Sequence, residues 1–578
     1  MASGKIADSY GRIEGNTTEQ ADAEQAYIQS KFEGDETWIS LPPELRPESW
    51  SKFKNPVCPL NLSLYGHPDS GGYWEKHCEE QLVKGGFVPI SDWRSCYWQP
   101  RLKLLLTVYV DDFKMSGPKE HMKEGWDIIR ENIKIDNPKE SNRYLGCQHV
   151  LSEDSDGRHI SYDVSDFMNQ CCLKYFDAAK CGSEDMKKAP TPFLPDEALT
   201  AADEESVGEL REDACKVLMK ILYGARIARF DLLNPTRALA SCVTKWTRAC
   251  DKKLHRLVSY IYHTRDHVLQ GTVNDKADDL YLRLYSDADF AGCPNSSRST
   301  SGVFLCLCGP NTLMPLAALS KKQPCVSHST PEAELVAADL AVRCEGIPAL
   351  IIWELILGRK MRLVFEEDNQ AAIVVMKTGY SAALRHMGRT HKVCLRWLHE
   401  RVVEHDMEVN YCLTHEQRAD IFTKGFTEPI KWAHAIDLIG IRPKDTSPKE
   451  ESPTTGLADK NRILPPKVVI PKLELSKLGD GLKVPLVPLK PKREPDQSGK
   501  ENKGPEYSQE PLKKNDTTPK LVSVRTRIVG RAPPQWLGAA TSTERPPSPQ
   551  WMAGAPQLLR PPVGGKLPLV RVGRGGCR

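Results

Sequence analysis

Hydrophobic and polar residues follow different periods along the chain, and each period predicts a different kind of element. Residues 104–116, LLLTVYVDDFKMS, open with a nearly continuous run of β-favouring residues, which predicts a strand. Residues 280–284 alternate leucine with other residues, which also predicts a strand. Helical spacing predicts two amphipathic helices, with apolar stripes formed by Leu239, Cys242, Val243 and Trp246 and by Leu254, Leu257, Val258, Ile261 and Tyr262.

The order of these patterns predicts a mixed α/β (α+β) chain in four parts. Residues 1–176 mix helix and strand signals, and residues 177–277 join a polar, Pro-containing stretch to the amphipathic helices. Strand and helix signals alternate over residues 278–430, which is typical of a compact α/β domain. Residues 441–578 are rich in Pro, Lys and Gly and poor in aromatic residues, which predicts a disordered tail.

Composition narrows the class of protein. The 578 residues are 40% hydrophobic and 27% charged, fractions typical of globular proteins. The chain has no apolar run long enough to span a bilayer, and its first residues lack the apolar core of a secretory signal. The 18 cysteines show no zinc-binding spacing. These features predict an intracellular protein of the cytoplasm or nucleus, with reduced thiols and no membrane partner.

Charge is unevenly distributed. The net charge is +3, yet residues 441–578 carry 26 Lys and Arg against 13 Asp and Glu. The remainder of the chain is therefore acidic, and the basic excess lies in the predicted tail. A basic, disordered tail of this kind predicts electrostatic binding to nucleic acid.

The paired acids Asp111 and Asp112 follow the strand at residue 104 directly, and two interpretations of them are open. Short polar side chains end strands, so the pair alone favours a turn between two strands. Two adjacent carboxylates also repel each other, and a divalent cation turns that cost into a gain. The local sequence favours the turn and leaves the metal site as the alternative.

Four more acids lie where predicted elements end or begin. Asp287 closes the strand LYLRLYSDADF, and Asp368 follows the apolar strand before NQAAIVVM. Glu334 lies early in the helix HSTPEAELVAADLA, where Glu332 has the capping-box spacing and Glu334 does not. Asp420 lies in THEQRADIFTKG, near a predicted helix start. Each acid alone is typical of a cap or a solvated charge, whereas together they predict a metal site if the fold gathers them.

Several stretches carry a family resemblance. YSDADFAGCPNSSRSTSGVFL, STPEAELVAADLA, EDNQAAI and EQRADIFTKGF resemble, in order, the ribonuclease H domain of copia-type retrotransposon Pol polyproteins. YVDD, YLGC, LSLYGHPDSGGYWEKHCEEQLVKGGF and ILYGARIARFDLLNPTRALA resemble the reverse transcriptase of the same polyprotein. The resemblance spans roughly residues 20–430. It implies a C-terminal Pol fragment: a truncated reverse transcriptase palm (1–176), a linker with a helical thumb or connection (177–277), a ribonuclease H-like mixed-sheet domain (278–430) and a disordered basic tail (441–578).

The resemblance also implies which residues act. Asp111 and Asp112 match the paired catalytic aspartates of the palm, and DAEQAYIQ makes Asp22 the candidate for the third. The ribonuclease carboxylates match Asp287, Glu334, Asp368 and Asp420. Both sites are expected to hold two Mg²⁺ or Mn²⁺ ions about 3.5–4 Å apart, bound by carboxylate oxygens. The expected partners are primer–template nucleic acid, RNA–DNA hybrid and other products of the polyprotein. Phosphate contacts are expected from Lys321, Lys322, Arg385, Arg389, His391 and Lys392.

The sequence departs from the family in its polymerase half. Only 21 residues precede Asp22, so we expect the fingers to be largely missing, and residues 14–21, EGNTTEQA, are polar for a buried strand. The leading hypothesis is therefore metal-dependent cleavage of RNA in RNA–DNA hybrids, with little or no DNA synthesis. Two alternatives stay open: a competent RNA-directed DNA polymerase within a larger assembly, and a catalytically silent nucleic-acid-binding remnant.

Overall fold

The computed structural model describes residues 2–154, 157–294, 296–444 and 571–572. The chain divides into two units, residues 1–447 with 559–578, and residues 448–558. Most of the predicted tail lies outside the described residues, although residues 441–443 form a strand. None of the helices described is both long and apolar enough to cross a membrane.

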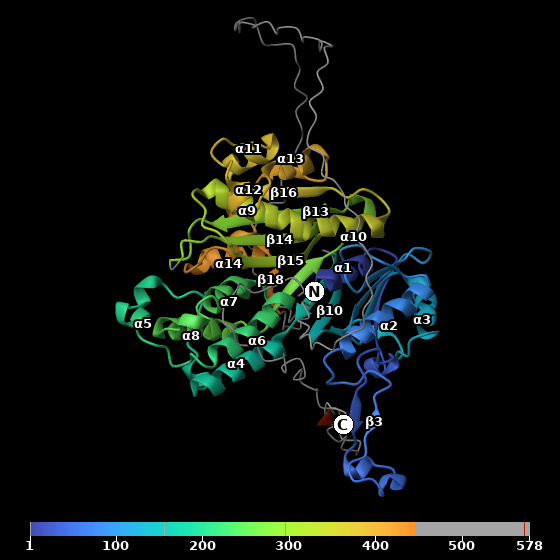
Figure 1. Ribbon diagram of the computed structural model, residues 1–578. Coiled ribbons are helices and arrows are strands. Elements are labelled where there is room, and N and C mark those ends of the chain that lie inside the picture. Colours follow the sequence, from blue (N-terminus) through green and yellow to red (C-terminus); the bar gives the residue numbers. More distant parts are fainter. Residues whose placement is uncertain (1, 155–156, 295, 445–570, 573–578) are drawn as a thin grey trace, which may run out of the picture. The chain divides into compact units, whose positions relative to one another are not determined.

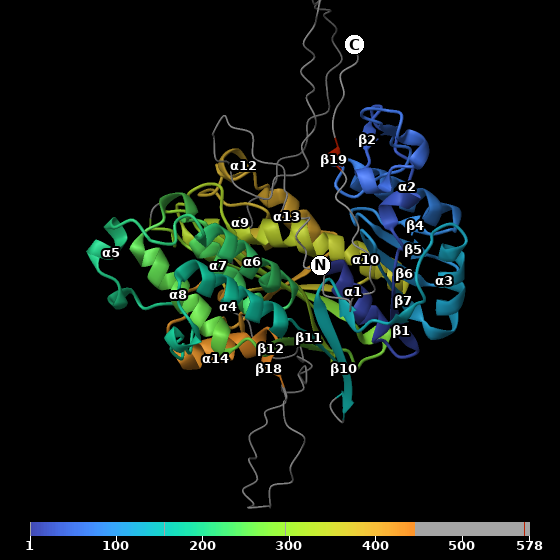
Figure 2. The same cartoon turned by 90° about the horizontal axis from the view of Figure 1, so that it is seen from below.

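A six-stranded antiparallel sheet occupies the first part of the chain. Its strands, in the order β4-β5-β6-β7-β1-β8, are Val88–Pro89, Cys96–Gln99, Leu104–Tyr109, Asp112–Pro118, Asn16–Asp22 and Lys139–Glu140. Helix α1 (Ala2–Gly11) covers one face, and α2 (Ser70–Lys84) and α3 (Met122–Arg130) cover the other (Figure 2). The continuous apolar run of β6 follows from this arrangement, because both faces of the strand are buried.

The burial of β1 corrects the expectation that its polar residues make a poor buried strand. β1 lies between β7 and β8, and its polar side chains find hydrogen-bond partners. Gln20, only 6% exposed, donates to the Arg143 carbonyl at 2.8 Å and accepts from Ser141 Oγ at 3.1 Å. Glu19 accepts the Trp126 indole N–H at 2.7 Å. A buried polar group costs little free energy once it is hydrogen-bonded, so the strand forms.

The second sheet carries the ribonuclease-like segment and confirms the predicted mixed fold class. Its order is β17-β16-β13-β14-β15-β12-β11-β10-β9, with β18 beside β12 (Figure 1). β13 pairs in parallel with β16, as β16 does with β17, whereas β14 and β15 pair antiparallel. The bounds in chain order are Arg143–Tyr144 (β9), Cys147–Asp154, Gly157–Asp163, His267–Thr272 (β12), Tyr281–Asp289, Thr300–Cys308, Leu313–Lys322, Leu363–Glu367, Glu408–Tyr411 and Ile441–Pro443 (β18).

Helices pack around this sheet and between its segments. α9 (Thr330–Ala341) lies on β13 and β14 and continues through a short π-helical turn into α10 (Ile347–Leu357). The others are Ser165–Ala179 (α4), Ala201–Glu205, Ala214–Ile227, Leu233–Ala240, Arg248–His263 (α8), Gln370–Thr378 (α11), Met387–Thr390, Leu395–Val403 and Pro429–Leu438 (α14). A small separate sheet joins β2 (Trp38–Ser40), β3 (Cys58–Pro59) and β19 (Arg571–Val572).

The two predicted amphipathic helices have different outcomes. α8 is confirmed, and Leu254, Leu257 and Ile261 of its stripe are fully buried. The helix predicted through Trp246 is wrong in extent, because α7 ends at Ala240. Trp246 instead donates its indole N–H to Asp251 of α8 at 2.7 Å, so it is buried without being helical.

The sheet crosses the predicted part boundaries. β10 and β11, from the region assigned to the palm, pair with each other, and β11 pairs with β12, from the region assigned to the helical connection. β12 in turn bridges to β15 at Thr272 and Leu313. The four-part division therefore remains a prediction, and the sheet hydrogen-bonds the parts to one another.

A fully buried ion pair joins the helices of the connection region. Arg229 and Asp231 are both 0% exposed, with Arg229 Nη2 2.7 Å from Asp231 Oδ2. The Arg229 guanidinium also donates to the Thr264 carbonyl at 2.7 Å, and the Tyr260 hydroxyl donates to Asp231 at 3.0 Å. Trp432 of α14 donates its indole N–H to Tyr260 Oη. The charges are thus paired and saturated with hydrogen bonds, as burial requires.

Candidate active sites

The β6–β7 hairpin brings the palm carboxylates together. In the strand register Asp22 at the end of β1 lies opposite Asp112 at the start of β7. Tyr109 and Asp112 close the hairpin, so the turn residues are Val110 and Asp111. The turn predicted at Asp111 and Asp112 therefore lies one residue earlier in the chain. Asp112 belongs to the strand and faces Asp22.

The electrostatics of this pair follow from its partial burial. Burial, then the charges of Asp111 and Asp22, raises the pKa of Asp112 to about 7. Burial also raises the pKa of Asp22, with contributions from Asp136 and Asp111 against the opposing charge of Lys139. Because Asp22 and Asp112 pair across the two strands, two carboxylates of like charge lie side by side, and a bound cation would offset their repulsion.

The hairpin turn itself is held under strain. Val110 has φ 58°, in the left-handed region that β-branched residues avoid. The Trp74 indole N–H donates to the Val110 carbonyl at 2.7 Å and fixes the turn against α2. Such strain persists only where surrounding contacts impose it, and it is concentrated at functional sites.

The second sheet gathers the four ribonuclease-like acids, which spacing alone did not establish. Asp287 lies in β13, Asp368 directly follows β16, Glu334 lies in α9, and Asp420 opens the 3₁₀ turn Asp420–Phe422. Carboxylate oxygens of Asp287, Asp368 and Asp420 lie within 4.8 Å of one another. Oxygens of Glu334 and Asp368 form a second group within the same distance. Chain segments more than 130 residues apart thus meet at one edge of the sheet.

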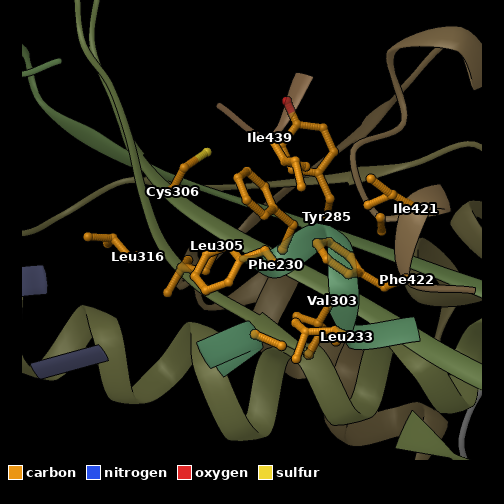
Figure 3. Close-up of a cluster of buried hydrophobic side chains, with 14 of the residues drawn as sticks. Phe230, Leu233, Tyr285, Val303, Leu305, Cys306, Leu316, Ile421, Phe422 and Ile439 are labelled. Carbon is orange, nitrogen blue, oxygen red and sulfur yellow. The ribbon is translucent and has the colours of Figure 1, made fainter. Parts of the chain in front are cut away.

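Packing holds Asp420 in place. Ile421 and Phe422, the next two residues, are 1% and 0% exposed and point into an apolar cluster with Phe230 and Leu233 (Figure 3). Phe422 stacks on Phe304 of β14 with ring centroids 6.2 Å apart. Full burial of such side chains stabilises by about 1.5–3 kcal/mol each, which anchors a turn too short to be stable alone.

The start of α9 positions Glu334. Ser329 is the N-cap, and its side chain accepts the Glu332 N–H at 3.4 Å, as the capping-box spacing predicts. The Glu332 carboxylate does not complete the box but accepts the His328 N–H at 3.0 Å. His386 Nε2 and His391 Nε2 lie 3.0 and 2.8 Å from Glu332 Oε1. Glu332 therefore has a structural role, and Glu334 is left for the carboxylate cluster.

Crowding and burial favour protonated acids in this cluster. Burial, then the charges of Glu367, Asp287 and Asp368, raises the pKa of Glu334 to about 11. Burial and the Asp287 charge raise the pKa of Asp420 to about 8, against the opposing charge of Lys424. Burial and Asp287 also raise the pKa of Asp368. A divalent cation would reverse these shifts.

Sequence reasoning missed two members of the cluster. Glu367, the last residue of β16, is 0% exposed, and its oxygens group with those of Glu334 and Asp368. Lys424 Nζ lies 2.7 Å from Asp420 Oδ1 and 3.4 Å from Asp287 Oδ1. The sequence does hold a signal for Glu367, the adjacent pair Glu366 and Glu367 in a predicted strand. Successive side chains of a strand point to opposite faces, so one of the two acids must face the interior.

The donor set fits Mg²⁺ or Mn²⁺. All five acids offer only carboxylate oxygens, the ligands that these hard cations prefer. Glu334 is 4% exposed, and its Oε2 has no hydrogen-bond partner among the described residues. A buried carboxylate oxygen without a partner is costly, and a bound cation would satisfy it.

The predicted phosphate-contacting residues divide into exposed and buried ones. Lys321, Arg385, Arg389 and Lys392 are exposed, and Lys322 is half-buried with Nζ 2.8 Å from Cys293 Sγ. The His391 side chain is 0% exposed and contacts Glu332, so a surface contact from it is excluded. His391 instead fastens the loop that presents Arg389 and Lys392.

Three relatives illustrate what the chain is similar to, although no family model matches it. It is 23% identical over 411 residues to the retrovirus-related Pol polyprotein from transposon RE1 of Arabidopsis thaliana. It is 25% identical over 424 residues to that from transposon TNT 1-94 of Nicotiana tabacum. The transposon Ty1-DR1 Gag-Pol polyprotein of Saccharomyces cerevisiae is 24% identical over 431 residues.

These matches cover 70–71% of this chain but only 26%, 29% and 23% of the respective relatives, so the chain spans about a quarter of their length. Among solved structures, a foamy viral protease-reverse transcriptase in complex with double-stranded DNA is 13% identical, with a TM-score of 0.36. That similarity covers 71% of this chain and 59% of the other. The sequence relatives confirm the predicted resemblance: over about 70% of its length the chain is similar to the Pol polyproteins of retrotransposons.

Proposed function

We propose that this chain is a metal-dependent nuclease that cleaves the RNA strand of RNA–DNA hybrids. The observation that carries the proposal is the convergence of Asp287, Glu334, Asp368 and Asp420, where the buried Glu334 Oε2 finds no partner among the residues that the structure describes. The Pol homology supports an enzyme of the nuclease or nucleotidyltransferase kind.

The chain's own residues supply the site. The carboxylates of Glu334, Asp368 and Glu367 would hold Mg²⁺ or Mn²⁺, which when bound activates water and stabilises charge on a phosphate. Asp287 is oriented by the Thr423 hydroxyl, which donates to its Oδ2. Arg385, Arg389 and Lys392 would meet the phosphates of the hybrid, and the 2′-hydroxyl would distinguish the strand to be cut.

Cleavage of a labelled RNA–DNA hybrid in Mg²⁺ or Mn²⁺ tests this function. Asp287→Asn keeps the shape of the side chain and removes its charge, so cleavage should fall by at least about 100-fold if Asp287 positions reacting groups. Asp289→Asn is the matched control two residues away. Asp289 accepts the Thr300 N–H, a bond that asparagine also accepts, so activity should stay near that of the wild type. Equal cleavage by Asp287→Asn and wild type would refute the site.

RNA-directed DNA synthesis is the second candidate, favoured by the contact between Asp22 and Asp112. Carboxylates brought together at a strained hairpin are suited to the metal ions of phosphoryl transfer. Primer extension on an RNA template in Mg²⁺, with Asp112→Asn as the inactive comparison, tests it. If the wild type extends the primer and Asp112→Asn does not, the chain is a polymerase. If the wild type does not extend the primer, this function is ruled out. Hybrid binding without cleavage or extension supports the silent remnant.

A further inference from the structure

The five acids of the ribonuclease-like site form two groups that share Asp368. The first group, Asp287, Asp368 and Asp420, already has a cation, because the Lys424 ammonium lies between Asp287 and Asp420. The second group, Glu334, Glu367 and Asp368, has no lysine, arginine or histidine within ion-pair distance in the part of the chain that is described. The two halves of one cluster are therefore electrostatically different.

We propose that Glu367 is a ligand of a divalent cation bound with Glu334 and Asp368, and that Lys424 occupies the place of a second cation between Asp287 and Asp420. This inference rests on the proposed nuclease site and departs from the expectation of two metal ions there. It assigns a metal ligand and an internal counter-ion to residues that sequence comparison did not single out.

The surroundings of Glu367 favour a ligand over a structural acid. Its Oε1 accepts the Asn369 N–H at 3.1 Å and its Oε2 accepts the Ser286 hydroxyl at 3.3 Å. These contacts fix the carboxylate yet leave each oxygen a further lone pair. Glu334, buried beside it, offers Oε2, which has no hydrogen-bond partner in the described part of the chain. Two buried carboxylates facing each other without a cation are unfavourable, and one Mg²⁺ would satisfy both.

The surroundings of Lys424 favour a built-in counter-ion over a chance surface contact. The Asn234 side-chain amide donates to the Lys424 carbonyl at 3.0 Å and fixes its backbone. The ammonium then reaches two carboxylates that belong to segments 133 residues apart. A metal ion bound by the same oxygens would lie about 2.0–2.1 Å from each, in the volume that the ammonium fills. Lys424 and a second metal ion thus exclude each other.

The test measures Mn²⁺ binding to the full chain without nucleic acid. Electron paramagnetic resonance reports the concentration of free Mn²⁺, and thermal melts with and without Mn²⁺ report the stabilisation. The wild type should bind one ion tightly at this site. Glu367→Gln, which keeps the hydrogen-bonding shape, should weaken binding by at least about 10-fold, the usual scale of losses around metal sites. Glu366→Gln removes the same charge from the neighbouring residue, which pairs with Arg283, and should leave binding nearly unchanged.

Lys424→Met tests the second half independently. Methionine has a similar length and no charge, so this variant should bind one ion more than the wild type and gain more melting temperature from Mn²⁺. Unchanged affinity in Glu367→Gln, or no additional ion bound by Lys424→Met, would overturn the proposal. The readout is metal binding, so the two proposals can fail separately. If the protein cleaves hybrid but the binding predictions fail, this inference is wrong and the proposed function stands. If the binding predictions hold but the protein cleaves no hybrid, the proposed function is wrong and this inference stands.

Discussion

At the residue scale, the carboxylates at the edge of the second sheet are the proposed source of the chemistry, and sequence could name only part of them. Asp287, Glu334, Asp368 and Asp420 carry recognisable local motifs. Glu367 and Lys424 do not, because their roles depend on neighbours that the fold brings from distant segments. The strand pattern predicts on which face of the sheet Glu367 lies, but it does not predict which other acids lie beside it.

The crowded acids predict a pH-dependent response to metal. The pKa values of Glu334 and Asp420, raised to about 11 and about 8, mean that the metal-free folded state holds protons which the unfolded chain loses above about pH 4.5. Proton binding by these two acids therefore stabilises the metal-free folded state at low pH. This stabilisation is lost as pH rises through the folded-state pKa values. Mg²⁺ binds the deprotonated acids, so the gain in melting temperature on adding Mg²⁺ should be larger at pH 8 than at pH 5.5.

Thermal melts of wild type and Asp368→Asn at both pH values measure this response. Without metal, Asp368→Asn should melt at the same or a higher temperature than the wild type, because repulsion within the cluster falls. Its response to Mg²⁺ should be small at both pH values. A wild-type gain that is equal at pH 5.5 and pH 8 would contradict the account.

At the scale of elements, the β6–β7 hairpin stores strain at Val110. Val110→Gly should raise the free energy of unfolding by about 1 kcal/mol, because relief of the left-handed backbone exceeds the entropy cost of glycine. Val108→Gly, in the regular part of β6, is the control and should lower it by more than about 1 kcal/mol, because it loses packing against the core as well as backbone rigidity. Urea unfolding compares the two, and a Val110→Gly protein less stable than wild type would count against strain at the turn.

The buried Arg229–Asp231 pair predicts a large loss of stability on removal of one partner. Asp231→Ala leaves a guanidinium buried and unpaired and should lower the free energy of unfolding by about 3–5 kcal/mol. Asp213→Ala removes an exposed partner of Lys216 and should change the free energy of unfolding far less, because solvent screens the pair. Chemical denaturation of both variants provides the measurement, and losses of similar size would show that the buried network contributes little.

Elements with a strong period could be predicted, and those held by long-range contacts could not. The stripe of α8 and the alternation of β13 are local signals, and both elements form as expected. β1 has no such signal, since its polar side chains depend on Ser141, Arg143 and Trp126. The end of α7 was missed for a similar reason: Trp246 continues the apolar spacing but packs through α8.

At the scale of the whole molecule, charge separates an acidic body from a basic tail. The tail from residue 445 lies outside the described residues except for 571–572, and its composition alone is basic. Deleting residues 445–578 should weaken binding to RNA–DNA hybrid and to DNA duplex alike, and should flatten the dependence of affinity on salt. Fluorescence anisotropy across a salt series measures both effects. An unchanged salt slope would mean that the tail does not contact phosphates.

The chain spans about a quarter of the length of the three relatives described above, so the whole polyprotein's activities do not transfer to it directly. The mixed sheet, by contrast, keeps the four matched acids within one site although they are spread over residues 287–420. Fold class was therefore accessible from sequence, and the four acids that the sequence singled out lie close together in the structure, although their role stays a prediction. The sheet that crosses the predicted part boundaries was not, because strand pairing between distant segments has no local signal.

The most direct test of the central claim is strand-selective cleavage. Purified full-length protein is mixed in Mg²⁺ or Mn²⁺ with an RNA–DNA hybrid labelled on either strand, and with RNA and DNA duplexes of the same sequence. The account predicts cleavage of the RNA strand of the hybrid alone, abolished in Asp368→Asn and retained in Asp289→Asn. Cleavage of the duplexes at similar rates, cleavage that survives Asp368→Asn, or no cleavage in either metal would contradict it.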